Sequence, residues 1–291
     1  MTSTLLSLSN ELPEPLLRFF EILSQQMDEL EIQEYFVVGA QARDLLLHYV
    51  YNLPMNRLTR DVDVAIAVQT WEQYSQLRET LINSGQFAAT PKIHHRLSFI
   101  EANLPIDLVP FGDVENPPGS IRWPPDQTIQ MNTMGFHEAY QHAITIQISP
   151  QTVLKVASLP GLTLLKLIAW SDRGNQSTKD AEDIGLLMKH YLDAGNFDRM
   201  NEKYPDLFED PDFDLDRASN RMLGRDVRLL LNTPAIYQQV VQILSQELDQ
   251  QGQLKLASVL SRYERSLEGN DFEKALSMLE NLYQGIIDPI L

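Results

Sequence analysis

Residues 59–68 read Thr-Arg-Asp-Val-Asp-Val-Ala-Ile-Ala-Val, and this stretch carries the pattern that decides the fold. From Val62 onward the run is rich in valine and alanine and alternates with a period of two, which predicts a β-strand. Because successive side chains of a strand point to opposite faces of its sheet, Asp61 and Asp63 share one face, while the valines beside them point toward a core. The stretch therefore predicts a strand that begins with two neighbouring carboxylates on one face.

The segments around this strand alternate between strand and helix. Tyr35–Val38 predicts a short strand that Gly39 breaks, and a helix with apolar residues on one side follows directly. After the central strand, Trp71 begins an amphipathic helix that stops near Gly85. Helical spacing of leucine, phenylalanine and methionine predicts one further helix within roughly the first 30 residues. This order favours an α/β layer.

The pattern changes twice farther along the chain. Between about residues 92 and 157 it predicts strands joined by proline and glycine turns, over 95–101, 105–111, 129–134, 144–148 and 153–158. After Pro160-Gly161 it predicts helices, over 161–172, 178–194, 233–250, 253–267 and 271–285. We therefore expect an α+β (mixed α/β) fold. Residues 1–159 would form a domain with a mixed sheet flanked by helices, and residues 160–291 a helical domain that completes the active-site cleft.

The composition excludes several classes of protein. A chain of 291 residues accommodates two domains of ordinary size. The absence of cysteine excludes a disulfide scaffold, a thiolate metal site and a cysteine nucleophile. No apolar run approaches the roughly 20 residues of a membrane helix, and the N-terminus has no secretory signal pattern. We therefore expect a cytoplasmic protein without membrane association.

The net charge of −17 bears on the partners of the protein. Nucleic-acid affinity comes largely from lysine and arginine that neutralise phosphates, so an acidic chain argues against broad, non-specific binding, although it is compatible with a local basic groove. Acidic residues crowd one short stretch, at Glu202, Asp206, Glu209, Asp210, Asp212, Asp214 and Asp216. This stretch is either a solvated loop or a docking surface for a basic partner.

The paired aspartates suggest a metal site. Two carboxylates held close together repel each other, and they persist most readily where a divalent cation binds both. Mg²⁺, or Mn²⁺ in its place, prefers such oxygen ligands together with substrate phosphates. Asp107 is the single charge in another apolar strand, and if the strands are neighbours, Asp61, Asp63 and Asp107 converge as metal ligands with Asp107 as the general-base candidate. The alternatives are a solvated strand edge for the pair and a structural, hydrogen-bonded carboxylate for Asp107.

Gly39-Ala40 forms a turn between a strand and a helix that suits a triphosphate. Backbone N–H groups at a helix N-terminus face outward there, and glycine permits close approach of a phosphate. Arg43 lies one turn into the helix, where it would reach a phosphate oxygen. Asp44 beside it offers the structural alternative, in which the carboxylate orients the arginine.

These motifs resemble those of a known superfamily. Gly39-Ala40, Asp61-Val62-Asp63 and Asp107 resemble the glycine turn, the Asp-x-Asp pair and the third aspartate of the DNA polymerase β-type nucleotidyltransferases. Residues 38–47 also look like the opening of CCA-adding enzymes and poly(A) polymerases, whose downstream base-reading motif is not found here. Two departures are Ala40 where the superfamily has serine or glycine, and an extra loop over residues 53–58.

The helical half extends the resemblance. Lys166, the only charge in the apolar stretch 161–170, either extends to the surface or lines a polar cleft. Together with Trp170-Ser171-Asp172-Arg173 and Lys179-Asp180-x-x-Asp183, it resembles the distal motifs of the AbiEii/AbiGii (MenT-like) nucleotidyltransferase toxins. The resemblance implies catalytic roles for Asp61, Asp63, Asp107, Lys166 and Asp183. It implies nucleotide-binding roles for Gly39, Ala40, Arg43, Thr59, Lys166, Arg173 and Asp180.

The resemblance implies transfer of a nucleoside monophosphate from an NTP to an acceptor, with tRNA as that acceptor and growth inhibition as the outcome. It also implies a cognate antitoxin encoded nearby. If tRNA binds, we expect basic residues of the helical half to line the cleft, with Arg217, Arg221, Arg225 and Arg228 as candidates; otherwise these are exposed charges on a helix. The alternatives are a small molecule or a protein hydroxyl as acceptor, and an inactive nucleotide-binding module. His94 and His95 are adjacent on a strand and so face opposite sides, which argues against a zinc site.

Overall fold

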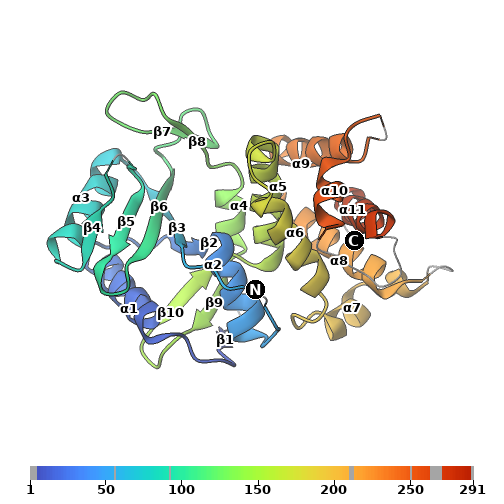
Figure 1. Cartoon of the computed structure of the whole chain (residues 1–291), viewed down its shortest axis with the longest axis horizontal. Coiled ribbons are helices and arrows are strands. Elements are labelled where there is room, and N and C mark those ends of the chain that lie inside the picture. The colour runs from blue at the N-terminus through green and yellow to red at the C-terminus, as the bar shows by residue number, and fades with distance from the viewer. Residues whose placement is uncertain are drawn as a thin grey trace. The chain divides into compact units, whose positions relative to one another are not determined.

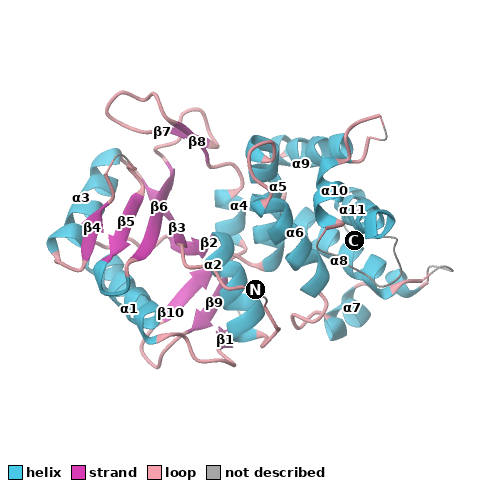
Figure 2. Cartoon of the chain, in the orientation of Figure 1, coloured by secondary structure: helices cyan, strands magenta, loops and turns pink. Residues whose placement is uncertain are grey.

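The computed structural model describes residues 5–55, 57–91, 93–209, 213–249, 251–262 and 271–289. Its contacts divide the chain into two compact units, Met1–Ser158 and Leu159–Leu291 (Figure 1). The first unit contains the strands, and the described residues of the second form helices and loops (Figure 2). Each unit has a hydrophobic core of its own.

The first unit is built on a mixed β-sheet. In chain order, its strands are β1 (Leu5–Ser7), β2 (Tyr35–Val38), β3 (Val62–Val68), β4 (Phe87–Ala89), β5 (Arg96–Phe99), β6 (Leu104–Gly112), β9 (Ile144–Gln147) and β10 (Val153–Val156). Their order across the sheet, as far as the structure describes it, is β1-β9-β10-β2-β3-β6-β5-β4. β3 is antiparallel to β2 and parallel to β6. A separate antiparallel pair consists of β7 (Ser120–Arg122) and β8 (Gln130–Asn132).

Helices cover both faces of this sheet. On one face, α1 (Glu14–Glu29) packs Phe19 against Phe87 and Phe99, and α3 (Trp71–Asn83) donates a hydrogen bond from Tyr74 Oη to the Leu108 carbonyl, 2.9 Å. On the other face, α4 (Phe136–Gln141) packs Phe136 against Phe111. Between β2 and β3 the chain forms α2 (Gly39–Asp44), which continues as the π-helix η1 (Leu45–Val50). The 3₁₀ turn η2 (Ile100–Ala102) connects β5 to β6.

The second unit is a group of packed helices. They are α5 (Leu159–Arg173), α6 (Lys179–His190), α7 (Phe197–Lys203), the 3₁₀ helix η3 (Pro205–Phe208), α8 (Leu215–Leu230), α9 (Pro234–Glu247), α10 (Lys255–Leu260) and α11 (Asp271–Ile287). α8 and α11 approach so closely that a Cβ built on Gly224 would lie 2.9 Å from Gly285 Cα. Arg221 and Arg225 then both pair with Asp288 just after α11, at 2.8 and 2.6 Å. Glycine packing and buried ion pairs therefore fix this helix pair together.

The fold class and the central strands agree with the sequence prediction, and several boundaries do not. β2 and β3 have the predicted bounds. The first helix begins where prolines favour a helix start, since α1 begins at Glu14 after Pro13; the residues before it include the strand Leu5–Ser7, which was not predicted and pairs with β9. The predicted helix 178–194 ends at His190.

α7 and α8 were not among the predicted helices. α8 is strongly amphipathic but polar overall, and its buried side includes the polar residues Ser219, Asn220, Arg225 and Asp226, so it offers few apolar residues to a sequence reading. The helix predicted over 253–267 is present as α10, and residues 263–267 lie outside the described residues. Asp210 and Asp212 of the acidic stretch also lie outside them.

Candidate active site

The sheet register places two of the predicted aspartates side by side. Asp63 of β3 is paired with Asp107 of β6, and Asp107 is paired with Arg96 of β5. On the other side of β3, Asp63 is paired with Val38, the last residue of β2. Paired residues of neighbouring strands share a face, so the glycine turn, Asp63, Asp107 and Arg96 form one row across the sheet. The condition set by the sequence, that the two aspartate strands be neighbours, is met.

The glycine turn lies directly against the carboxylate of Asp63. Gly39 has a φ of +67°, which disfavours any residue with a side chain. A Cβ built at this position would overlap the Asp63 carboxylate and would lie 2.9 Å from its Cγ. Both backbone conformation and space therefore require glycine here, and the first helical N–H groups of α2 stay next to an acidic side chain.

Asp107 is bound by an arginine that the sequence analysis did not assign. Arg96 donates two hydrogen bonds, from Nε to Asp107 Oδ1 and from Nη2 to Asp107 Oδ2, both 2.7 Å long. His95 Nε2 lies 3.9 Å from Asp107 Oδ2. The hydrogen bonds to Asp107 raise the pKa of the Arg96 guanidinium, and the charges of Asp61 and Asp63 add to this effect. The Arg96 guanidinium thus lies in the electrostatic field of all three aspartates that were predicted to bind a metal ion.

A buried carboxylate positions the segment that leads to Asp61. Asp44 is 1% exposed, and its Oδ1 accepts hydrogen bonds from Arg43 Nε at 2.9 Å and Nη2 at 2.5 Å. Its Oδ2 accepts a 2.6 Å hydrogen bond from the Thr59 backbone N–H, and Thr59 Oγ1 accepts one from the Asp61 N–H at 3.3 Å. Asp44 therefore orients Arg43, which was the structural alternative for this arginine. Asp44 also connects the end of α2 to the aspartate pair through Thr59.

The carboxylates fit a divalent cation only in part. Asp61 is exposed, Asp63 is half-buried, and both offer the oxygen ligands that Mg²⁺ prefers. Asp107, in contrast, has both oxygens bonded to Arg96. Within the described ranges, no group of three or more His, Cys, Asp or Glu side chains is arranged to hold a metal ion. The residues present thus fit a cation held by Asp61 and Asp63, with Asp107 joining only if Arg96 releases it.

The predicted lysine of the second unit lies in an ion-pair cluster. Lys166 Nζ on α5 is 2.5 Å from Asp183 Oδ2 and 3.1 Å from Asp180 Oδ1, both on α6. Burial alone would lower the pKa of Lys166, but Asp183 and Asp180 raise it above the usual value. The lysine therefore keeps its charge although its side chain is only 12% exposed, and it does not extend freely to the surface.

Arg173 completes this cluster. It donates from Nε to Asp180 Oδ2 at 2.6 Å and from Nη2 to Asp180 Oδ1 at 2.9 Å. Burial would raise the pKa of Asp180, but the bonds from Arg173 and the charge of Lys166 lower it. Asp180 thus holds both cations in place.

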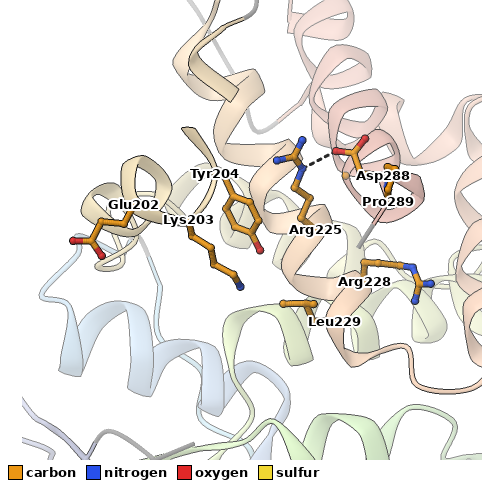
Figure 3. A pocket seen from close by; sticks show the side chains of 9 residues that line it. Glu202, Lys203, Tyr204, Arg225, Arg228, Leu229, Asp288 and Pro289 are labelled. Atoms are coloured by element: carbon orange, nitrogen blue, oxygen red, sulfur yellow. Dashed lines mark hydrogen bonds and ion pairs between the residues drawn. The ribbon is translucent and has the colours of Figure 1, made fainter. Parts of the chain in front are cut away.

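The arginines of α8 mainly serve packing. Arg225 donates to Asp206 at 2.8 and 2.6 Å as well as to Asp288, and the Arg228 guanidinium lies 4.3 Å from the Tyr237 ring centroid. A cavity of about 380 Å³ borders them; its lining includes Glu202, Lys203, Tyr204, Arg225, Arg228 and Asp288 (Figure 3). The guanidinium of Arg225 is directed to Asp288 in Figure 3. Arg225 is therefore engaged in structural pairs, whereas Arg217 is exposed.

A family comparison decides the class of protein. A model described as "Nucleotidyl transferase AbiEii toxin, Type IV TA system" matches residues 45–280, most of the chain. The chain belongs to this family. It is therefore a nucleotidyltransferase toxin, as the sequence analysis predicted. The matched span contains Asp61, Asp63, Asp107 and the Lys166 cluster, and it begins after the Gly39 turn.

Solved structures give similarities of low identity. An antigenic nucleotidyltransferase-like protein from Paracoccidioides brasiliensis has 18% identity and a TM-score of 0.41, with 68% of this chain and 93% of that chain covered. The antibiotic-resistance factor ANT(2'')-Ia in solution has 11% identity and a TM-score of 0.38, with 67% and 95% covered. Its crystal structure with adenylyl-2"-tobramycin has 12% identity and a TM-score of 0.37, with 64% and 98% covered. No protein of curated function matches the chain.

The predicted residues fall into two groups, one in each unit. The first unit brings together Gly39, Asp63 and Asp107, with Asp61 two residues before Asp63. The second brings together Lys166, Arg173, Asp180 and Asp183. Arg96 was missed because the sequence does not show which residue of β5 faces Asp107. In the part of the chain that the structure describes, no helix is both long and apolar enough to cross a membrane.

Proposed function

We propose that this toxin transfers a nucleoside monophosphate from an NTP to tRNA and that Mg²⁺ is required. An acceptor hydroxyl oxygen forms a bond to the α-phosphorus, the bond between the α-phosphorus and the bridging oxygen breaks, and pyrophosphate leaves. The hydroxyl proton passes to a base. The observation that carries the proposal is the Asp63–Asp107 register pair beside the Gly39 turn.

The residues of the first unit have distinct roles in this proposal. The turn at Gly39 and Ala40 presents backbone N–H groups to the triphosphate. Asp61 and Asp63 hold Mg²⁺, which when bound neutralises phosphate charge and lowers the pKa of the attacking hydroxyl. Asp107 would accept the proton once the Arg96 guanidinium turns from it toward a substrate phosphate and leaves one carboxylate oxygen free.

The Lys166 cluster holds one protonated lysine at a fixed place. Asp180 and Asp183 hold the ammonium in place and keep it protonated, which suits a contact to the triphosphate. Asp183 is then a positioning residue of the catalytic set, and Asp180 positions both Lys166 and Arg173. Thr59 serves the nucleotide site through its bond to Asp44, and Arg43 through the same carboxylate.

Membership of the toxin family supports our inference about the acceptor and the partners. We infer a tRNA acceptor, a cognate antitoxin encoded nearby and a cytoplasmic location. The net charge of −17 supports a second candidate, a small-molecule or protein hydroxyl. Incubation of the protein with Mg²⁺, each α-³²P-labelled NTP and cell extract, followed by separation of RNA, protein and small molecules, distinguishes them. We expect label in the tRNA fraction; label confined to protein or to small molecules would reject tRNA as the acceptor.

A further inference from the structure

A second cavity of the first unit adjoins the aspartate row. It has a volume of about 300 Å³ and is lined by Ile93, His94, His95, Arg96, Trp123 and Ile129. We refer to it as the ring slot. Two chain segments build it: the loop that leads into β5, and the loop of the β7–β8 hairpin. The hairpin lies beyond the end of β6 in Figure 1. Within it, the backbone N–H of Trp123 donates a hydrogen bond to the Ile129 carbonyl at 2.9 Å.

Two aromatic rings of the ring slot are nearly parallel. The His94 and Trp123 rings are inclined by 17° with centroids 6.4 Å apart, and the His95 ring lies 5.6 Å from Trp123. Carbon atoms pack about 3.5 Å apart, so a planar ring with a neighbour on each face needs about 7 Å. A small movement of His94, which is exposed, would admit such a ring.

One wall of the ring slot is fixed, and it contains an unsatisfied donor. Trp123 is 2% exposed and packs against Trp71 and Tyr74 of α3, with centroids 5.4 and 5.6 Å away. Its buried indole N–H has no hydrogen-bond partner among the described residues. Buried polar groups are nearly always paired, and this nitrogen has almost no exposed surface, so an acceptor atom of a ligand would reach it only once the ring slot opens. Ile129, on the same hairpin as Trp123, is 50% exposed.

The ring slot lies on the acceptor side of the proposed reaction. Across the sheet the order is the Gly39 turn after β2, then Asp63, Asp107 and Arg96. The proposed NTP site is at the Gly39 end of this row, and the ring slot is at the Arg96 end. Arg96 both lines the slot and bonds Asp107. A molecule held in the slot is therefore next to the candidate base on the side away from the nucleotide donor.

The lining indicates the chemistry of that molecule. None of the lining residues is acidic, although the chain has a net charge of −17. A nucleobase stacks on aromatic faces and carries carbonyl and ring-nitrogen acceptors for the indole N–H. A tyrosine ring has no such ring acceptor. We propose that the ring slot binds a nucleobase at the acceptor end of an RNA strand, an inference that rests on the proposed transfer to RNA.

Binding of fluorescein-labelled hexaadenylate, measured by anisotropy without NTP or metal, tests this inference. The comparison RNA has the same sequence but no base on its 3′-terminal ribose. Loss of the base should weaken binding to the wild-type protein about 5- to 100-fold, the range expected for a stacked base. His94→Ala should weaken binding of the full RNA similarly, and loss of the base should then cost the variant less than about twofold. His137→Ala, an exposed histidine of α4, is the matched control and should leave binding unchanged.

Several outcomes would overturn the inference. Equal binding of the two RNAs by the wild-type protein, no measurable binding of either, or an equal loss for both in His94→Ala would each do so. Competition by N-acetyltyrosinamide but not by adenosine 5′-monophosphate would assign the slot to a protein acceptor instead. Because no NTP is present, a negative binding result leaves the transfer assay untouched, and a negative transfer assay does not alter the binding result.

Discussion

Gly39 and the carboxylate of Asp63 occupy adjoining space, so that a Cβ at position 39 would lie 2.9 Å from Asp63 Cγ. The turn that we assign to the triphosphate and the aspartate that we assign to the metal are therefore structurally dependent on each other. A change at either residue displaces the other. This relationship can be tested separately from general effects on stability.

Gly39→Ala should abolish detectable transfer and lower stability. Its φ of +67° costs an alanine about 1–2 kcal/mol, and overlap with Asp63 adds to this. Gly85→Ala is the matched control, because Gly85 has a φ of +73° and nothing lies within 4 Å of a Cβ there. Urea denaturation and transfer assays should show a similar strain cost in both variants, with activity lost only in Gly39→Ala. Loss of activity in both variants, or in neither, would contradict the account.

Asp44→Asn should destabilise the first unit. The substitution removes the buried ion pair between Arg43 and Asp44, and breaking a buried ion pair typically costs about 3–5 kcal/mol. It also weakens the bond to the Thr59 N–H, so the Asp61 segment should exchange its amide hydrogens faster. Urea denaturation and hydrogen exchange measure the two effects. Asp113→Asn, at an exposed position, should change neither; a cost below about 1 kcal/mol for Asp44→Asn would reject the positioning role.

Lys166→Met should raise the KM for NTP about 10- to 100-fold, the range for loss of a hydrogen bond to a charged group. Asp180 keeps its two bonds from Arg173, but the buried Asp183 loses its pair with Lys166, so a urea midpoint must first show that the variant is folded under the assay conditions. Lys179→Met, at an exposed position on α6, serves as the control. Steady-state kinetics with a varied NTP concentration measure this KM. An unchanged KM in Lys166→Met would reject the assignment of Lys166 to the nucleotide site.

Acid should weaken the second unit through Asp226. Burial would raise the pKa of Asp226, but the bonds from Arg199, Tyr191 and Tyr204 lower it below 3.8. A carboxyl with a depressed pKa stabilises the fold above its unfolded pKa, and that stabilisation is lost as the pH falls toward the folded value.

Asp226→Asn should therefore be less stable than wild type at about pH 6, by about 3 kcal/mol, and the difference should shrink below about pH 4. Urea midpoints measured across this range test the prediction, with Asp193→Asn, at an exposed position, as the control. A difference that stays constant down to about pH 2.5 would show that the charge of Asp226 contributes nothing.

Local patterns in the sequence were sufficient for the central strands and for choosing candidate residues, but not for the short strands β1, β4 and β7. The period-two run predicted β3 and put Asp61 and Asp63 on one face, and the single lysine of an apolar helix identified Lys166. Both inferences use residues within a few positions of each other, where alternation and helical spacing are reliable guides.

Features that depend on distant pairing were not predictable in this way. The bond between Arg96 and Asp107 requires the register of β5 against β6, which neither strand encodes by itself. The bond between Asp44 and the Thr59 N–H was not predicted, because the sequence does not show that Thr59 lies next to the end of α2. α8 was missed because its buried face mixes apolar and charged residues, whose charges are satisfied only by other helices and by residues just after α11.

Transfer of label from [α-³²P]NTP to tRNA by variants at Asp61 and Asp63 tests the central claim most directly. Wild-type protein and Asp113→Asn should label tRNA with Mg²⁺, lose the reaction in EDTA, and transfer nothing from [γ-³²P]NTP. Asp61→Asn and Asp63→Asn, which keep side-chain size but lose the charge, should be slower by about a thousandfold, since metal-ion catalysis contributes several kcal/mol. Wild-type rates in both variants, or transfer of the γ-label, would contradict the assignment of these aspartates to nucleotidyl transfer.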